Sequence, residues 1–110
     1  MAGLVKKQIV FTRNVAKLID YIFSQGYFCT LGEAYRTEEQ ALLYAQQGKG
    51  IKASLHCKRL AIDLNLFSPS GKYLTASEDH KSFGTFWESL DKNNVWGGNF
   101  NDGNHYQMSE

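Results

Sequence analysis

Near the start of the chain, apolar residues recur three or four positions apart, the spacing that places them on one face of a helix. These residues are Val15, Leu18, Ile19, Ile22 and Phe23. Gly26 follows the run, and glycine is a common residue just beyond the end of a helix. The pattern predicts a helix that ends near Phe23, followed by a strand from Tyr27 to Tyr35.

A second apolar pattern, in the middle of the chain, has a period of two. Leu60, Ile62, Leu64 and Leu66 alternate with Ala61, Asp63 and Asn65. This alternation is typical of a half-buried strand, so we expect a strand from Leu60 to Phe67 with Asp63 facing away from the apolar side. The turn signal Ser68-Pro69-Ser70-Gly71 ends it and leads to a short segment around Tyr73.

Two further helices are expected. Thr37 and Gln40 form a capping-box pattern that opens a helix through about Gln47, and Gly48-Lys49-Gly50 ends it. Ser77 can cap a last helix, whose apolar face consists of Phe83, Phe86, Trp87 and Leu90. Together the elements predict an α+β fold, in which helices pack on one side of a small, mainly antiparallel sheet and leave a cleft on its other side.

Composition narrows the class of protein. A chain of 110 residues with 43% hydrophobic content is expected to form a single domain, residues 1–110. A net charge of +1 gives no basic field for nucleic acid. No apolar run approaches the roughly 20 residues of a membrane span, and Met1 to Lys7 lacks a signal-peptide core. We therefore expect a monomer that is made in the cytoplasm.

Neither the two cysteines nor the third histidine, His80, is expected to belong to a functional site. Cys29 and Cys57 make neither a disulfide framework nor a paired metal motif. Cys57 is adjacent to His56, but neighbouring side chains in an extended segment point in opposite directions, so a free, partly buried thiol is expected. His80 lies where the first turn of a solvated helix is predicted.

His56, Asp63 and His105 provide two imidazoles and one carboxylate, the ligand set of an open, catalytic zinc site. His56 and Asp63 are seven positions apart, which is roughly 10 Å along a helix and more than about 20 Å along a strand, so the chain must bend between them. We place His56 on the loop that enters the strand, where small Ala61 leaves room for a metal. Asp102 is expected to project from the turn-rich segment before His105, toward the same face.

These residue types predict a hydrolytic mechanism. Zinc held by three protein ligands keeps a fourth position for water, whose pKa falls to about 7. Asp102 can take the proton and return it to the leaving amine. Arg36 suits the negative charge that develops on the carbonyl oxygen. Blander alternatives are that Asp102 only caps a turn, and that Arg36 only pairs with Glu38 or Glu39.

Three separated segments together resemble a known family. The segments are Ser54-x-His56-(x)4-Ala61-x-Asp63, Trp96-Gly97-Gly98 and Asp102-x-x-His105-Tyr106. They are similar to the zinc DD-peptidases and L-alanyl-D-glutamate endopeptidases, in particular the bacteriophage endolysin branch, and the resemblance extends upstream to Ala34–Ala41. It implies the hedgehog/DD-peptidase fold, with His56, Asp63 and His105 as zinc ligands and Asp102 as general base.

The resemblance also implies that Arg36 steadies the substrate or the oxyanion and that Ser54 donates a hydrogen bond near the site. Trp96 can line the substrate groove or pack beside it, and we count it among the candidate substrate-binding residues. Many family members have glycine at the position of Arg59, so this chain departs from the pattern there. The departure can mark a different substrate groove.

The expected substrate is therefore a stem peptide of bacterial peptidoglycan, cut between L-Ala and D-Glu. An endolysin of this kind would need a separate pore protein to reach the wall. Removal of a terminal D-Ala is the nearest alternative, and it requires a cation such as Arg36 or Arg59 to bind a free carboxylate. A zinc-stabilised binding module without activity is the alternative from another class, and Asp102 argues against it because such a site has no use for that carboxylate.

Overall fold

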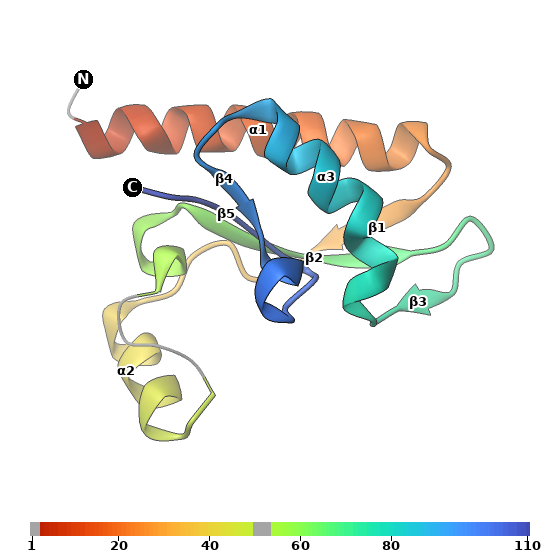
Figure 1. The fold of residues 1–110 in the computed structure, drawn as a ribbon. Helices are drawn as coiled ribbons and strands as arrows, with labels where there is room; N and C mark the ends of the chain where they lie inside the picture. The colour runs from red at the N-terminus through yellow and green to blue at the C-terminus, as the bar shows by residue number, and fades with distance from the viewer. Residues whose placement is uncertain (1–2, 50–53) are drawn as a thin grey trace.

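A computed structural model describes residues 3–49 and 54–110 of the chain (Figure 1). In chain order, the elements are α1 (Gly3–Ser24), β1 (Phe28–Leu31), α2 (Glu38–Gln46), the 3-10 helix η1 (Leu55–Lys58), β2 (Ala61–Phe67), β3 (Tyr73–Leu74), the 3-10 helix η2 (Ser77–His80), α3 (Lys81–Leu90), β4 (Asn94–Trp96), the 3-10 helix η3 (Gly97–Phe100) and β5 (His105–Met108). None of the described helices is long and apolar enough to cross a membrane.

The strands form one sheet in which every pairing is antiparallel. Its order is β1-β2-β5-β4, and β3 pairs with the C-terminal end of β2. Helices α1 and α3 lie together along one face of this sheet, whereas α2 lies away from them, below the sheet in this view (Figure 1). The predicted α+β class and antiparallel sheet are confirmed. Among the described α-helices, α1 and α3 lie on one side of the sheet as predicted, whereas α2 does not.

The core lies between the sheet and the pair α1 and α3. Leu60, Ile62, Leu64 and Leu66 are at most 5% exposed, and Asp63 and Asn65 between them are only partly buried. The apolar side chains pack with Leu18 and Ile22 of α1 and with Phe83 and Trp87 of α3. Each such side chain contributes about 1.5–3 kcal/mol by leaving water. The predicted alternation is thus confirmed from Ile62 to Phe67, whereas Ala61 is buried as well. It turns Asp63 to the face opposite the core.

Helix α1 extends much further toward the N-terminus than the apolar run that predicted it. Phe11 and Asn14 are buried and continue the stripe formed by Leu18 and Ile22. A polar residue on a buried stripe hides this continuation from a search for apolar spacing. The predicted end is correct, because Gly26 follows the helix with a φ of 82°.

Strand β1 is shorter than predicted and ends at Leu31, not at Tyr35. The Gly32 N–H still donates to the Asp63 carbonyl at 2.8 Å, and the Asp63 N–H donates to the Glu33 carbonyl at 2.9 Å. A Cβ atom on Gly32 would lie 2.8 Å from the Asp63 carbonyl oxygen, so glycine permits this close crossing. Beyond it, the chain leaves the sheet and carries Arg36 toward the site.

Two predictions around η2 were wrong. Ser77 does not cap the helix: its Oγ accepts a hydrogen bond from the Gly103 N–H at 2.9 Å and so ties η2 to the loop before β5. His80 is not solvated but 2% exposed, with its Nδ1 2.8 Å from the Tyr106 hydroxyl. Burial lowers the pKa of His80 to about 4, so this imidazole is neutral at neutral pH.

Candidate metal centre

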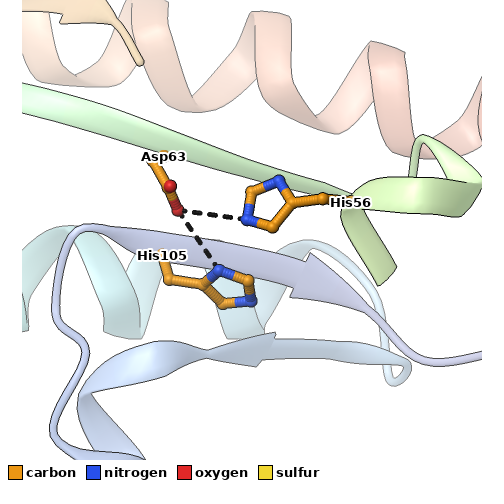
Figure 2. A group of neighbouring side chains, drawn as sticks. All are labelled: His56, Asp63 and His105. Atoms are coloured by element: carbon orange, nitrogen blue, oxygen red, sulfur yellow. Dashed lines mark hydrogen bonds and ion pairs between the residues drawn. The ribbon is translucent and has the colours of Figure 1, made fainter. Parts of the chain in front are cut away.

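Three side chains that are distant in sequence meet on the face of the sheet opposite the core. His56 comes from η1, Asp63 from β2 and His105 from β5, and Asp63 and His105 are direct partners in the antiparallel register. Asp63 Oδ1 lies 3.4 Å from His56 Nε2 and 3.2 Å from His105 Nδ1 (Figure 2). One ligand atom from each residue lies within 4.8 Å of the others, which is close enough for all three to bind one ion.

The bend that brings His56 to Asp63 is built by the residues at the two ends of η1. The Ser54 Oγ accepts a hydrogen bond from the His56 N–H at 3.2 Å and caps the start of this turn. Arg59 ends it with a φ of 55°, in the left-handed region, and the chain then enters β2. The loop position predicted for His56 is therefore a 3-10 turn. Cys57 belongs to the same turn, so its predicted extended backbone was wrong, but its thiol is free and partly buried as expected.

The electrostatics of the cluster favour a charged carboxylate between two imidazoles. Burial alone would raise the pKa of Asp63, but hydrogen bonds and attraction from His105 and His56 outweigh it and lower this pKa to about 2. For His105 the directions are reversed. Burial would lower its pKa, but its contacts with Asp63 and Gln107 outweigh burial and raise this pKa. Asp63 is consequently ionised at neutral pH.

The donor set fits a zinc ion. Two buried imidazoles and one carboxylate are ligands that zinc accepts in open sites. The imidazole of His105 turns Nδ1 toward Asp63, and its Nε2 donates to the Gln107 Oε1 at 2.7 Å. A hydrogen bond on the outer nitrogen is typical of metal-binding histidines, because it fixes the tautomer and the ring orientation.

The cluster opens into a cleft of about 400 Å³. Its walls are formed by Arg36, Lys49, Ser54, Leu55, His56, Asp63, Phe100, Asp102, His105 and Gln107. Every residue expected to act in the site, except Trp96, is among them. Lys49, Leu55, Phe100 and Gln107 were not predicted. Only Gln107 carried a usable signal, because it lies two residues from His105 and so on the same face of the strand.

Asp102 lies at the mouth of the cleft on the loop between η3 and β5. Its Oδ2 is 3.9 Å from His105 Nδ1, and its side chain is 54% exposed. The Asp102 N–H donates to the Gly97 carbonyl at 2.8 Å, and a Cβ atom on Gly97 would lie 2.1 Å from the Asp102 carbonyl oxygen. The close approach of Gly97 to the Asp102 backbone therefore places a solvent-accessible carboxylate beside the candidate metal ligands.

Arg36 lies in the cleft wall with 13% of its side chain exposed. Its Nε and Nη2 both donate to Glu33 Oε1, so its partner is Glu33 and not Glu38 or Glu39, the partners that the alternative to a catalytic role named. Its backbone N–H donates to the His56 carbonyl at 3.2 Å. Glu33 was missed in the sequence, although it precedes Arg36 by only three residues.

Trp96 packs beside the site. Its indole N–H donates to the Gly103 carbonyl at 2.7 Å, and its ring lies against Gly84 and Gly98, where Cβ atoms would clash with it. It supports the loop that carries Asp102 and is not part of the described cleft wall. Of the two alternatives for this residue, the contacts favour packing, and substrate binding by Trp96 stays a prediction. Arg59 likewise lies outside this cleft wall, with its guanidinium 4.0 Å from the centre of the Tyr35 ring.

Comparison with known proteins finds similarity at the level of structure. No protein-family model matches the chain, and no curated protein matches its sequence. The L-Ala D-Glu endopeptidase ChiX of Serratia marcescens superposes with a TM-score of 0.62 at 18% identity, over 74% of this chain and 67% of that one. A mutant of the vancomycin resistance D,D-pentapeptidase VanY, in complex with Zn(II), superposes with a TM-score of 0.60 at 16% identity, over 89% of this chain and 70% of that one. The chain has the fold of these peptidases, as the resemblance implied.

Proposed function

We propose that the protein is a zinc-dependent peptidase that hydrolyses the stem peptides of bacterial peptidoglycan. The observation that carries this proposal is the placement of His56, Asp63 and His105 within 4.8 Å of one another, beside an exposed Asp102 in one cleft. The fold shared with ChiX and with zinc-bound VanY supports it. His56 Nε2, Asp63 and His105 Nδ1 are the groups that would hold the zinc.

The cleft residues have complementary roles in peptide hydrolysis. Zinc, when bound, supplies the activation of water and the polarisation of the peptide carbonyl. Asp102 accepts the proton of the attacking water and returns it to the leaving amine. Its carboxylate is exposed, so both the water and the amine can reach it. Arg36 uses two of its five N–H groups on Glu33, and its remaining donors are available to the oxygen on which negative charge develops.

The bond cut is proposed to be the one between L-Ala and D-Glu. This follows the resemblance of the three motif segments to the endolysin branch, and the structural similarity to ChiX supports it. Removal of a terminal D-Ala is the second candidate, favoured by the similarity to VanY and by the two cations of the cleft wall, Arg36 and Lys49. Arg59 lies outside the described wall, so Arg36 and Lys49 are the better placed candidates for binding a free carboxylate in this cleft.

A zinc-stabilised binding module without activity would use the same three metal ligands. It would have no need of Asp102, whose side chain is 54% exposed. Among the described residues, the Asp102 carboxylate accepts no hydrogen bond, and its ion-pair partner is His105 at 3.9 Å. A peptidase requires a carboxylate at this place to carry the proton. The position of Asp102 therefore favours the enzyme.

A synthetic stem pentapeptide, incubated with the zinc-loaded protein, separates these functions. Mass spectrometry should show L-Ala released from a D-Glu-containing remainder if the proposed bond is cut. Loss of a single D-Ala would assign the second candidate instead. An intact peptide, with protein that is folded and zinc-bound, would contradict both and leave the binding module.

A further inference from the structure

Glu33 lies between two groups that are proposed to act in the site. Its Oε1 accepts hydrogen bonds from Arg36 Nε, at 2.8 Å, and from Arg36 Nη2. The same oxygen lies 3.7 Å from His56 Nδ1. One carboxylate thus faces both the arginine of the cleft wall and a candidate metal ligand.

The Nδ1 atom of His56 needs such a partner. Because Nε2 faces Asp63, Nδ1 is the outer nitrogen of this imidazole. It is buried and has no hydrogen-bond partner among the described residues, and Glu33 is the carboxylate that approaches it. The corresponding outer nitrogen of His105 already donates to Gln107. A buried N–H without a partner costs about 1–3 kcal/mol, so a small rotation of Glu33 toward Nδ1 would be favourable.

The backbone holds Glu33 in this position. The Glu33 carbonyl accepts the Asp63 N–H at 2.9 Å, and the Arg36 N–H donates to the His56 carbonyl at 3.2 Å. The segment between Glu33 and Arg36 is therefore bonded at its two ends to two of the candidate ligands. This arrangement fixes the carboxylate relative to the metal-binding cluster and not only relative to Arg36.

We propose that Glu33 is a positioning residue. Its carboxylate faces Nδ1 of His56 and so orients the imidazole for zinc binding through Nε2, and at the same time it holds Arg36 in the cleft. Its negative charge makes the imidazole a stronger ligand and balances the guanidinium, which is only 13% exposed. The proposal rests on the proposed zinc peptidase. It differs from a plain Arg36–Glu33 ion pair, because an ion pair alone would not affect zinc affinity.

Zinc affinity, measured by competition with a chromophoric chelator, tests this role. Glu33→Ala should weaken zinc binding by about 10- to 100-fold, the usual effect of removing the partner of a metal-binding histidine. Glu33→Gln should fall between that variant and the wild type, because its amide oxygen accepts the His56 N–H but carries no charge. Arg36→Ala should bind zinc almost as tightly as the wild type, since Glu33 still faces His56.

Glu39→Ala is the matched control, because Glu39 is exposed in the neighbouring helix and its removal changes the net charge equally. It should leave zinc affinity unchanged, and the thermal midpoints of the metal-free proteins report whether each variant folds. Equal zinc affinity of Glu33→Ala, Glu33→Gln and wild type would overturn the proposal, as would an equal loss in Arg36→Ala and Glu33→Ala. These outcomes are independent of peptide hydrolysis, so the role of Glu33 can fail while the peptidase stands, or the reverse.

Discussion

The two aspartates of the site have different environments, and these suit different roles. Asp63 lies between two imidazoles, which keep its pKa low, whereas Asp102 is more than half exposed at the mouth of the cleft. The first is suited to bind a cation and the second to exchange protons with water and substrate. The order of the two aspartates along the chain does not by itself say which one binds the cation and which one exchanges protons.

Asp102→Asn should therefore keep zinc affinity and lose hydrolysis. An amide cannot accept the proton of the attacking water, so turnover of a stem peptide should fall by about 10²- to 10⁴-fold. Metal analysis and initial rates on the same preparation measure the two quantities. Asp20→Asn, an exposed change on α1, is the matched control and should leave both unchanged. Wild-type turnover in Asp102→Asn would refute the assignment of the base.

His80 predicts a dependence of stability on pH. Its pKa is lowered by burial from 6.5 in the unfolded chain to about 4 in the fold, despite the opposing attraction of Asp79. As pH falls below 6.5, the unfolded state binds a proton that the folded state does not, so the free energy of unfolding decreases. The loss between about pH 7.5 and about pH 5 is on the order of 2 kcal/mol.

Urea unfolding of the metal-free protein at these two pH values measures this contribution. His80→Gln has no titrating ring and can keep a hydrogen bond to Tyr106, so its stability should decrease less than that of the wild type over the same range. All other side chains are the same in both proteins, so their contributions cancel in the comparison. The same decrease in both proteins would show that His80 does not cause it.

At the scale of elements, the loop from η3 to β5 depends on one close contact. Gly97 is buried, and a Cβ atom there would overlap the Asp102 carbonyl oxygen. Gly97→Ala should move Asp102 away from His105 and reduce turnover more than 10-fold, because small displacements of a catalytic group are costly. Gly3→Ala, where a Cβ atom has open space, is the control and should leave turnover unchanged. Full activity of Gly97→Ala would mean that the loop adapts without moving its carboxylate.

The turn from η1 to β2 has Arg59 at a position where many members of the family that the motifs resemble have glycine. The backbone there is left-handed, which costs a non-glycine residue about 1–2 kcal/mol. The Arg59 guanidinium partly offsets this cost by a cation–π interaction with the Tyr35 ring, which contributes about 0.5–1 kcal/mol at an exposed site.

Two substitutions at Arg59 separate these effects. Arg59→Ala loses the Tyr35 contact and keeps the strain, so the free energy of unfolding should fall by about 0.5–1 kcal/mol. Arg59→Gly loses the contact but relieves the strain, and it should be more stable than Arg59→Ala. Chemical denaturation of both variants measures the difference. An alanine variant at least as stable as the glycine variant would contradict the strained turn.

For the whole molecule, sequence patterns predicted what depends on period and composition. The alternation along β2 placed Asp63 opposite the core, and the three motif segments brought His56, Asp63 and His105 to one site. The patterns failed where a contact between distant segments decides the structure. Ser77 bonds Gly103 and His80 bonds Tyr106, each across 26 positions, and neither contact has a local signature.

Zinc-dependent cleavage of purified peptidoglycan tests the account most directly. The protein is freed of metal with a chelator and then titrated with zinc, while released stem-peptide fragments are followed by mass spectrometry. We predict that the rate rises in proportion to bound zinc, saturates at about one zinc per chain, and is absent in His105→Ala. Metal-free protein that cleaves as fast as the zinc form would contradict the proposed function.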